Sequence, residues 1–266
     1  MSKLLKRVLL KLMHGLRRKL MNRISDYGQL KDRIVSWLKS YIQQSGQRAF
    51  VVGVSGGIDS AVVSTLCAET GYPVYALGMP IHQAQGQKTL SVNHLLWLTE
   101  NYDNVSMVQF DLTTVFESLK TSLKGFAKNE LSLANTRSRL RMVTLYQIAG
   151  EHGGLVAGTG NKVEDYGVGF YTKYGDGGVD IAPIADLYKT EVWELGKYLG
   201  VSQDIVEAQP TDGLWDDTRT DEDQLGASYP DLEEAMEYGT GPAVEVLEKF
   251  NKMNSHKMQP IPTFKL

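Results

Sequence analysis

A glycine-rich segment in the first quarter of the chain carries the residue types that bind phosphate. It reads Ser55-Gly56-Gly57-Ile58-Asp59-Ser60 and follows the short apolar run at residues 49–54 directly. The paired glycines let the backbone approach an anion without a side chain in the way, and a helix that begins there points its amide groups at that anion. Ser55 and Ser60 add hydroxyl donors, and Asp59 offers the hard oxygen ligand that Mg²⁺ prefers. The segment therefore predicts a site for nucleotide phosphates and Mg²⁺.

The spacing excludes two familiar phosphate loops, since the segment has neither the lysine of a Walker loop nor the G-x-G-x-x-G of a dinucleotide loop. A bare glycine pair would also fit a tight strand-to-helix turn that binds nothing. The full Ser-Gly-Gly-x-Asp-Ser resembles the pyrophosphate loop of the N-type ATP pyrophosphatases. That resemblance implies cleavage of ATP between its α and β phosphates and transfer of AMP to a substrate oxygen. ATP would then be held by Gly53, Val54, Ser55, Gly56, Gly57, Ile58, Asp59 and Ser60.

The elements around this loop alternate between strands and helices. Apolar runs predict buried strands at residues 49–54, 74–79, 105–110 and 154–157, with a candidate fifth strand at 179–184. Helical patterns occur at 34–42, 59–69, 90–101, 130–150, 188–199 and 243–254. This alternation favours an α/β fold, a doubly wound parallel sheet of about five strands flanked by helices. Ligands bind such sheets at the carboxyl ends of the strands, where the glycine segments at 53–60 and 158–160 both fall.

Composition and charge restrict the class of protein. The net charge is −3, yet residues 1–20 carry seven basic side chains and no acidic one. The remaining acidic body is a poor nucleic-acid surface, so no nucleic-acid partner is expected. Residues 1–20 are predicted to form a basic amphipathic extension, too charged to be an integral membrane segment, and residues 21–266 a single domain. The extension fits a simple appendage, a membrane-surface role or a targeting role. Cys67 is the single cysteine, which excludes an intrachain disulfide and fits a cytoplasmic location.

The second half of the chain resembles the NAD synthetases, and the similarity runs from about residue 27 to near the C-terminus. It is carried by the stretches ANTRSRLRM, LVAGTGNKVEDYGVGFYTKYGDGGVDIAPIADLYKTEVWELGKYLGV, QPTDGLWDDTRTDEDQLGASYPDLE and NSHKMQ. In these enzymes the carboxylate of deamido-NAD attacks the α-phosphate of ATP, pyrophosphate leaves, and ammonia then displaces AMP from the adenylated acyl carbon. The resemblance thus implies ATP, deamido-NAD and ammonia as substrates, Mg²⁺ as cofactor, and a homodimer.

The resemblance also implies roles for individual positions. Asp59 and Glu164 would ligate Mg²⁺, Asp59 and Lys189 would be catalytic, and ATP would also contact Thr159, Lys189 and Thr211. Deamido-NAD would contact Arg139, Lys173, Asp180, His256 and Lys257. Simpler explanations exist: Arg139 belongs to a charge stripe with Arg137 and Arg141, and His256-Lys257 lies in what reads as a surface tail. Lys189 opens a helix, where a cation opposes the helix dipole, which favours a role in ligand binding.

This chain departs from the family pattern at two places. Ile58 stands where many bacterial relatives have Gln, and residues 160–164 read Gly-Asn-Lys-Val-Glu where many have Asp-His-Ala-Ala-Glu. Glutamine-dependent NAD synthetases carry a large N-terminal amidase domain with a catalytic cysteine, whereas about 50 residues precede the loop here. Free ammonia is therefore the expected nitrogen donor, and Cys67 is expected to be a buried small hydrophobe.

Two other functions are also compatible with a phosphate loop of this kind. A tRNA-thiolating ATP pyrophosphatase would use paired cysteines and a basic surface, which this chain lacks. A nucleotide-binding regulatory module without turnover would keep the phosphate loop but need not keep Glu164 and Lys189 together. The acidic segment at residues 214–223 is predicted to lie at the surface, either as a lid that orders over the site or as a solvated loop.

Overall fold

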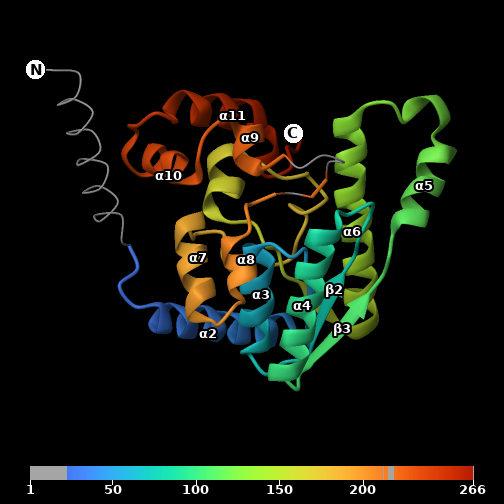
Figure 1. Ribbon diagram of the computed structural model, residues 1–266, viewed down its shortest axis with the longest axis vertical. Helices are drawn as coiled ribbons and strands as arrows, with labels where there is room; N and C mark the ends of the chain where they lie inside the picture. Colours follow the sequence, from blue (N-terminus) through green and yellow to red (C-terminus); the bar gives the residue numbers. More distant parts are fainter. Residues whose placement is uncertain (1–22, 212, 215–218, 266) are drawn as a thin grey trace, which may run out of the picture.

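Four short strands form one parallel sheet at the centre of the protein (Figure 1). The computed structural model describes residues 23–211, 213–214 and 219–265. The strands lie in the order β3-β2-β1-β4, and they are β1 (Ala49–Gly53), β2 (Val74–Gly78), β3 (Val105–Gln109) and β4 (Gly154–Val156). The predicted fold class, a doubly wound α/β sheet flanked by helices, is confirmed, with four strands instead of about five.

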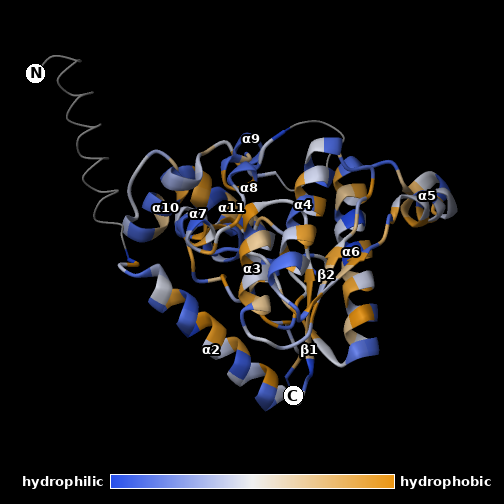
Figure 2. Cartoon of the chain, turned by 60° about the horizontal axis from the view of Figure 1, so that its bottom comes forward, coloured by the Kyte–Doolittle hydropathy of each residue, from blue (hydrophilic) through white to orange (hydrophobic). Residues whose placement is uncertain are grey.

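Side chains of the central strand β1 alternate between two apolar layers, as the twofold period of a strand requires. Phe50 and Val52 pack into a core shared with α2 (Tyr27–Ser45), α3 (Ile58–Ala68), α4 (Gln85–Asn101) and α7 (Lys189–Tyr198). Val51 packs on the opposite face, against Met142 and Leu145 of α6 (Glu130–His152). In Figure 2 the central strands are mainly hydrophobic, whereas the surrounding helices carry both colours. Burial on both faces explains why β1 reads as a continuous apolar run.

The direction of chain winding reverses beside β1. β1 pairs in parallel with β2 on one side and with β4 on the other. The loops that leave β1 and β4 therefore diverge at their carboxyl ends, which is where open α/β sheets bind ligands. The two glycine segments singled out in the sequence begin at this point.

Each of the six predicted helical segments is helical, although several boundaries differ. α2 is longer than predicted at both ends, from Tyr27 to Ser45, and α4 begins at Gln85. α11 (Val244–Met258) continues beyond the predicted end at residue 254. His256 and Lys257 therefore lie in the last turn of a helix and not in an irregular tail.

The candidate fifth strand at residues 179–184 is reduced to one parallel bridge, between Ala157 and Ile181. The amides of Asp180 and Ile181 both reach the carbonyl of Val156. Pro183 has no amide to donate, so the pairing cannot continue along this segment.

Several elements have no counterpart in the sequence prediction. They are α5 (Thr113–Ser122), the 3₁₀ turn η1 (Lys124–Phe126), α8 (Gln203–Glu207), α9 (Asp221–Leu225) and α10 (Tyr229–Tyr238). No element was predicted between residues 158 and 178, yet this stretch contains the π-helix η2 (Val163–Val168). Side chains of η2, α9, α10 and the start of α11 form a separate apolar cluster that includes Val163, Tyr229 and Leu232.

Two sequence predictions fall wholly or partly outside the described residues. These are the amphipathic extension at residues 1–20 and the middle of the acidic segment at 214–223. The described end of that segment enters α9, where Asp221 is buried. None of the helices in the described ranges is long and apolar enough to cross a bilayer.

Candidate active site

The loop after β1 is held in a shape that exposes backbone amides. Gly56 has φ +93°, and a β-carbon there would lie 2.7 Å from the carbonyl oxygen of Gln87, so a larger residue does not fit. The Ser60 hydroxyl donates to the Gly57 carbonyl at 2.9 Å and lies 3.1 Å from the Ser55 hydroxyl. Among the residues that the structure describes, no side chain caps α3 at Gly57. The first-turn amides of α3 are therefore available to an anion, as the sequence predicted.

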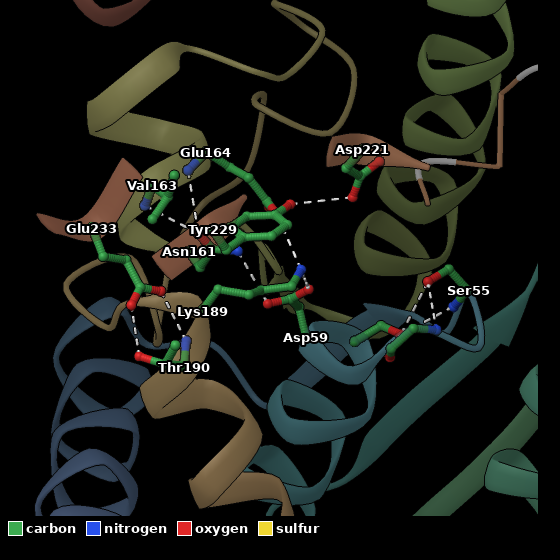
Figure 3. A network of polar contacts seen from close by, with 12 residues as sticks. Ser55, Asp59, Asn161, Val163, Glu164, Lys189, Thr190, Asp221, Tyr229 and Glu233 are labelled. Atoms are coloured by element: carbon green, nitrogen blue, oxygen red, sulfur yellow. Dashed lines mark hydrogen bonds and ion pairs between the residues drawn. The ribbon is translucent and has the colours of Figure 1, made fainter. Parts of the chain in front are cut away.

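Three charged side chains meet beside this loop, although they come from three different elements (Figure 3). Lys189, the first residue of α7, places its ammonium 2.5 Å from Asp59 Oδ2 and 3.1 Å from Glu164 Oε1. Asp59 belongs to the first turn of α3, and Glu164 to η2. Lys189 is 2% exposed. We call this set of three residues the charge cluster.

Surrounding groups hold the charge cluster in place. The Asn161 amide donates to Asp59 Oδ1 at 3.2 Å, and the Asn161 side-chain oxygen accepts from the backbone amide of Glu164. The buried Glu233 accepts from the backbone and the hydroxyl of Thr190, at 2.9 and 2.7 Å. The bonds between Thr190 and Glu233 fix the first turn of α7. The helix macrodipole by itself disfavours a lysine at this end of a helix.

The electrostatics of the cluster favour a charged lysine. Burial acts against the Lys189 ammonium, but the Asp59 and Glu164 carboxylates outweigh burial and raise the pKa of Lys189 above its usual value. Burial raises the pKa of Asp59, while the Lys189 charge opposes that rise. The pKa of the adjacent Asp165 is raised to about 7 by burial and then by the charges of Glu164, Asp176 and Asp59.

A cavity of about 340 Å³ opens in front of the loop and the charge cluster. Of the predicted site residues, its lining includes the whole loop from Gly53 to Ser60, together with Thr159, Glu164, Lys189 and Thr211. The opposite wall is contributed mainly by α4, α6 and the ends of β2 and β3. The structure thus brings together all the residues predicted to bind ATP and Mg²⁺.

The residues predicted to contact deamido-NAD do not line this cavity. Four of them form a chain of contacts beside it: the Arg139 guanidinium reaches the carbonyl of Lys173 at 3.3 Å, and the Lys173 ammonium reaches the carbonyl of His256 at 3.2 Å. Lys257 donates to the carbonyl of Tyr171 at 2.8 Å, and Tyr171 does line the cavity. These four residues therefore flank the cavity at the C-terminal end of α11.

Asp180, the fifth residue of that predicted set, lies elsewhere. Its carboxylate accepts from the Tyr146 hydroxyl at 2.9 Å and from the amide of Val156 at 2.8 Å. Both bonds tie the segment after residue 178 to β4 and α6, so the contacts seen here are structural.

The sequence prediction missed several residues of the site. Arg141 was grouped with Arg139 in a charge stripe, yet it lines the cavity and donates to the carbonyl of Met79 at 3.0 Å. Asp165 and Asp176 also line the cavity. Tyr229 contacts Glu164 from α10. The position of Asp165 next to Glu164 in the sequence could have identified it as a site residue. The helical period does not distinguish Arg141 from the neighbouring arginines, so the sequence could not have identified it.

The charge cluster suits a metal that is shared with a ligand. Within the described ranges, no group of three or more His, Cys, Asp or Glu side chains could hold a metal ion by itself. Mg²⁺ in nucleotide sites typically takes one or two carboxylates, and phosphate oxygens and water complete its coordination. Asp59 and Glu164, next to a loop that exposes amides, supply that donor set.

Comparison with known proteins agrees with this geometry. The family model described as NAD synthase matches residues 30–264. A protein named NH(3)-dependent NAD(+) synthetase from Carboxydothermus hydrogenoformans is 37% identical over 85% of this chain and 93% of its own length. Its namesake from Alkaliphilus metalliredigens is 38% identical over 87% and 96% of the two chains. The solved structure of an NMN synthetase from Francisella tularensis is 32% identical, with a TM-score of 0.83 over 91% of this chain and 100% of that one. The chain belongs to the NAD synthase family.

Proposed function

We propose that this protein amidates deamido-NAD to NAD with ATP and free ammonia. The carboxylate oxygen of the pyridine ring attacks the α-phosphate of ATP, and pyrophosphate leaves. Ammonia then attacks the acyl carbon, AMP leaves with the former carboxylate oxygen, and the nitrogen loses a proton. The single observation that carries the proposal is the charge cluster of Asp59, Glu164 and Lys189 beside the amide-rich loop. Lys189 is a cation that can stabilise the departing pyrophosphate, and the two carboxylates are the ligands that nucleotide-bound Mg²⁺ takes.

The loop and Lys189 have distinct parts in this reaction. The first-turn amides of α3 bind the β and γ phosphates, where negative charge collects as the bond to the α-phosphate breaks. Lys189, kept charged by its two carboxylate partners, turns from them toward the phosphates. Thr159 and Thr211 border the same cavity and offer hydroxyl groups to the nucleotide.

Mg²⁺ fits this site through Asp59 and Glu164. When bound, it would screen the phosphate oxygens and assist departure of pyrophosphate. The two carboxylates both contact the Lys189 ammonium and both line the cavity. Asn161 restrains both Asp59 and the backbone of Glu164, which fixes the two ligands relative to each other.

The second group of predicted residues is assigned to deamido-NAD. Arg139, Lys173 and Lys257 place three cations beside the cavity, and His256 offers its backbone carbonyl to Lys173. A dinucleotide phosphate would replace the carbonyl groups that these cations contact, because it accepts charge-assisted hydrogen bonds. Asp180 is assigned to the same substrate by resemblance, with its carboxylate at the end of β4.

The direct test is formation of NAD from deamido-NAD, ATP and ammonium by the purified chain. Pyrophosphate release must depend on deamido-NAD, and Asp59→Ala must abolish both products. Saturable ATP binding without pyrophosphate release would favour a regulatory module instead. Efficient turnover with glutamine would contradict the assignment of ammonia as the donor.

A second candidate substrate is the mononucleotide counterpart of deamido-NAD, which lacks the AMP half. The observation in its favour is the similarity to the Francisella tularensis NMN synthetase, at a TM-score of 0.83. The chemistry at the acyl carbon is the same for both substrates, so the charge cluster does not discriminate between them. Comparing kcat/KM for the two substrates at saturating ATP and ammonium decides the question.

We infer that the protein is a homodimer. Exposed apolar side chains on α5 and α6 support this, namely Val115, Leu131 and Val143. Sedimentation velocity tests the oligomeric state, and Val143→Glu should shift a dimer toward monomer.

We further infer a cytoplasmic location, which fits a single reduced cysteine. We also infer one catalytic domain from residue 21 to 266 that follows the basic extension.

A further inference from the structure

Tyr229 lies at the base of the charge cluster without belonging to it. It is the first residue of α10, it is fully buried, and its ring stands edge-on to Trp193 at 6.2 Å between centroids. Its backbone amide donates to the Glu222 side chain of α9 at 2.9 Å. The corner between α9 and α10 therefore fixes its backbone independently of the charge cluster.

The side chain of Tyr229 touches two members of the charge cluster at once (Figure 3). The hydroxyl lies 2.7 Å from Glu164 Oε1 and 3.2 Å from Asp221 Oδ2. A phenol carries one proton, so it donates to one carboxylate at a time, and the shorter distance favours Glu164. The face of the ring lies 4.8 Å from the Lys189 ammonium, within the range of a cation–π contact.

Tyr229 and Lys189 share a single acceptor atom. Both bond to Glu164 Oε1, and within the described part of the chain the Glu164 carboxylate receives hydrogen bonds from these two residues alone. Asn161 bonds the backbone of Glu164 and not its carboxylate. When Lys189 turns toward phosphate oxygens, the Tyr229 hydroxyl is the donor that remains to hold Glu164.

We propose that Tyr229 is a positioning residue that keeps Glu164 oriented toward Mg²⁺ and ATP after Lys189 has turned away. This inference rests on the proposed function and adds a residue to it. The hydroxyl holds Oε1 and leaves Oε2 free to face the cavity. The ring supports Lys189 in the resting arrangement.

The test separates the hydroxyl from the ring. Tyr229→Phe keeps the buried ring, the contact with Trp193 and the cation–π contact, and removes the bond to Glu164. A hydrogen bond to a charged acceptor corresponds to about a tenfold change in an equilibrium constant. The half-saturating Mg²⁺ concentration for NAD formation should therefore rise about tenfold. Calorimetric titration of ATP in the presence of Mg²⁺, with no deamido-NAD present, should show weaker binding by a similar factor.

Tyr102→Phe is the matched control. Its hydroxyl also bonds a glutamate, Glu69, at 2.8 Å, and neither residue lines the cavity. Loss of that bond can change the melting temperature but not the Mg²⁺ dependence. An unchanged Mg²⁺ dependence in Tyr229→Phe, or an equal change in Tyr102→Phe, would overturn the proposal.

A double variant keeps the test decisive if Tyr229→Phe also loses stability. If Tyr229 acts through Glu164, its effect on Mg²⁺-dependent ATP binding disappears once Glu164→Gln is present, and additive losses would contradict this. Failure of the proposed function has a different signature. A wild-type protein that makes no NAD, yet binds ATP with Mg²⁺ more tightly than Tyr229→Phe, overturns the function and leaves the positioning role standing.

Discussion

The ammonium of Lys189 lies 2.5 Å from the Asp59 carboxylate, although 130 positions separate the two residues in the sequence. The contact joins the first turns of α3 and α7. The Lys189 side chain is buried and that of Asp59 is partly buried, with exposures of 3% and 15%. Such a pair stabilises the fold only as a pair, because each charge alone would be costly to bury. The catalytic role proposed for Lys189 is therefore coupled to its structural role.

Replacing Lys189 with Met should reduce both activity and stability. Loss of the cation removes charge stabilisation of the departing pyrophosphate, which we expect to lower kcat by about 10²–10³-fold. It also leaves two partly buried carboxylates without a cation, at a cost of about 3 kcal/mol in the free energy of unfolding. Steady-state kinetics and urea denaturation measure the two effects.

Lys197→Met is the matched control on the same helix. Lys197 pairs with Glu194 at 2.6 Å, but both side chains are about half exposed. Exposed pairs of this kind contribute less than about 1 kcal/mol, so activity should be unchanged and stability nearly so. Normal kcat in Lys189→Met would remove the central residue from the proposed mechanism.

Gly160 should tolerate no side chain. A β-carbon there would overlap the carboxylate of Asp165, which lines the cavity next to Glu164. Gly160→Ala should therefore displace η2 and reduce kcat/KM for ATP by at least about tenfold, since small misplacements of catalytic groups are costly. Restored activity in the double variant Gly160→Ala, Asp165→Ala would identify the overlap as the cause.

Gly150→Ala provides the comparison for that experiment. Gly150 lies within α6, and a β-carbon there meets nothing within 4 Å. The helix should gain about 0.5–1 kcal/mol from the change, because alanine restricts the unfolded chain. Activity equal to wild type is expected. If Gly160→Ala also has wild-type activity, then the packing of Asp165 against the backbone of residue 160 is not needed for activity.

The sequence alone predicted the local half of the candidate site, and the family resemblance added the distant Glu164 and Lys189. Residues 53–60 are contiguous, and their glycines and hydroxyls predict a phosphate loop directly. Tyr229 contacts Glu164, and Asn161 contacts Asp59, only once α10 and η2 have packed. The spacing of these residues along the sequence predicts neither contact. Arg139 and Arg141 read alike, yet the turn of α6 aims one at the carbonyl of Lys173 and the other at that of Met79.

The fold, like the candidate site, was predicted only in part from the sequence. The apolar runs located all four strands. In β1, β2 and β4 burial on both faces leaves a continuous hydrophobic signal, whereas the edge strand β3 is partly exposed and its signal is weaker. The segment at 179–184 carried the same signal, but Pro183 limits it to one bridge. The short helices α8 and α9 have five residues each, too few for a helical period to emerge from the sequence.

His94 should make the protein less stable in mild acid. It is 2% exposed, stacks on Trp97 and lies 3.0 Å from the Ser64 hydroxyl. Burial lowers the pKa of His94 to about 4, whereas an unfolded histidine titrates near about 6.5. Between these values the unfolded chain binds the extra proton, so stability falls as the pH decreases. The loss from this group between pH of about 7.5 and 5 should be about 2 kcal/mol.

His94→Phe isolates that contribution. Phenylalanine retains an aromatic ring against Trp97, and Ser64 keeps its bond to the carbonyl of Ser60 at 2.7 Å. The variant can differ in stability at neutral pH, but its urea midpoint should change less with pH over the same window. An identical pH dependence in both proteins would show that His94 is not the group responsible.

Cys67 should be dispensable for catalysis and inert in the folded protein. Its side chain is fully buried within α3, and burial raises the pKa of the thiol above its usual value. A nucleophilic cysteine needs the opposite, a thiolate that its substrate can reach. Cys67→Ala should therefore keep full ammonia-dependent turnover and lose about 1 kcal/mol of stability from the deleted sulfur. A thiol reagent should modify the native protein only as fast as α3 opens. Rapid labelling, or loss of activity in Cys67→Ala at normal stability, would contradict a purely structural cysteine.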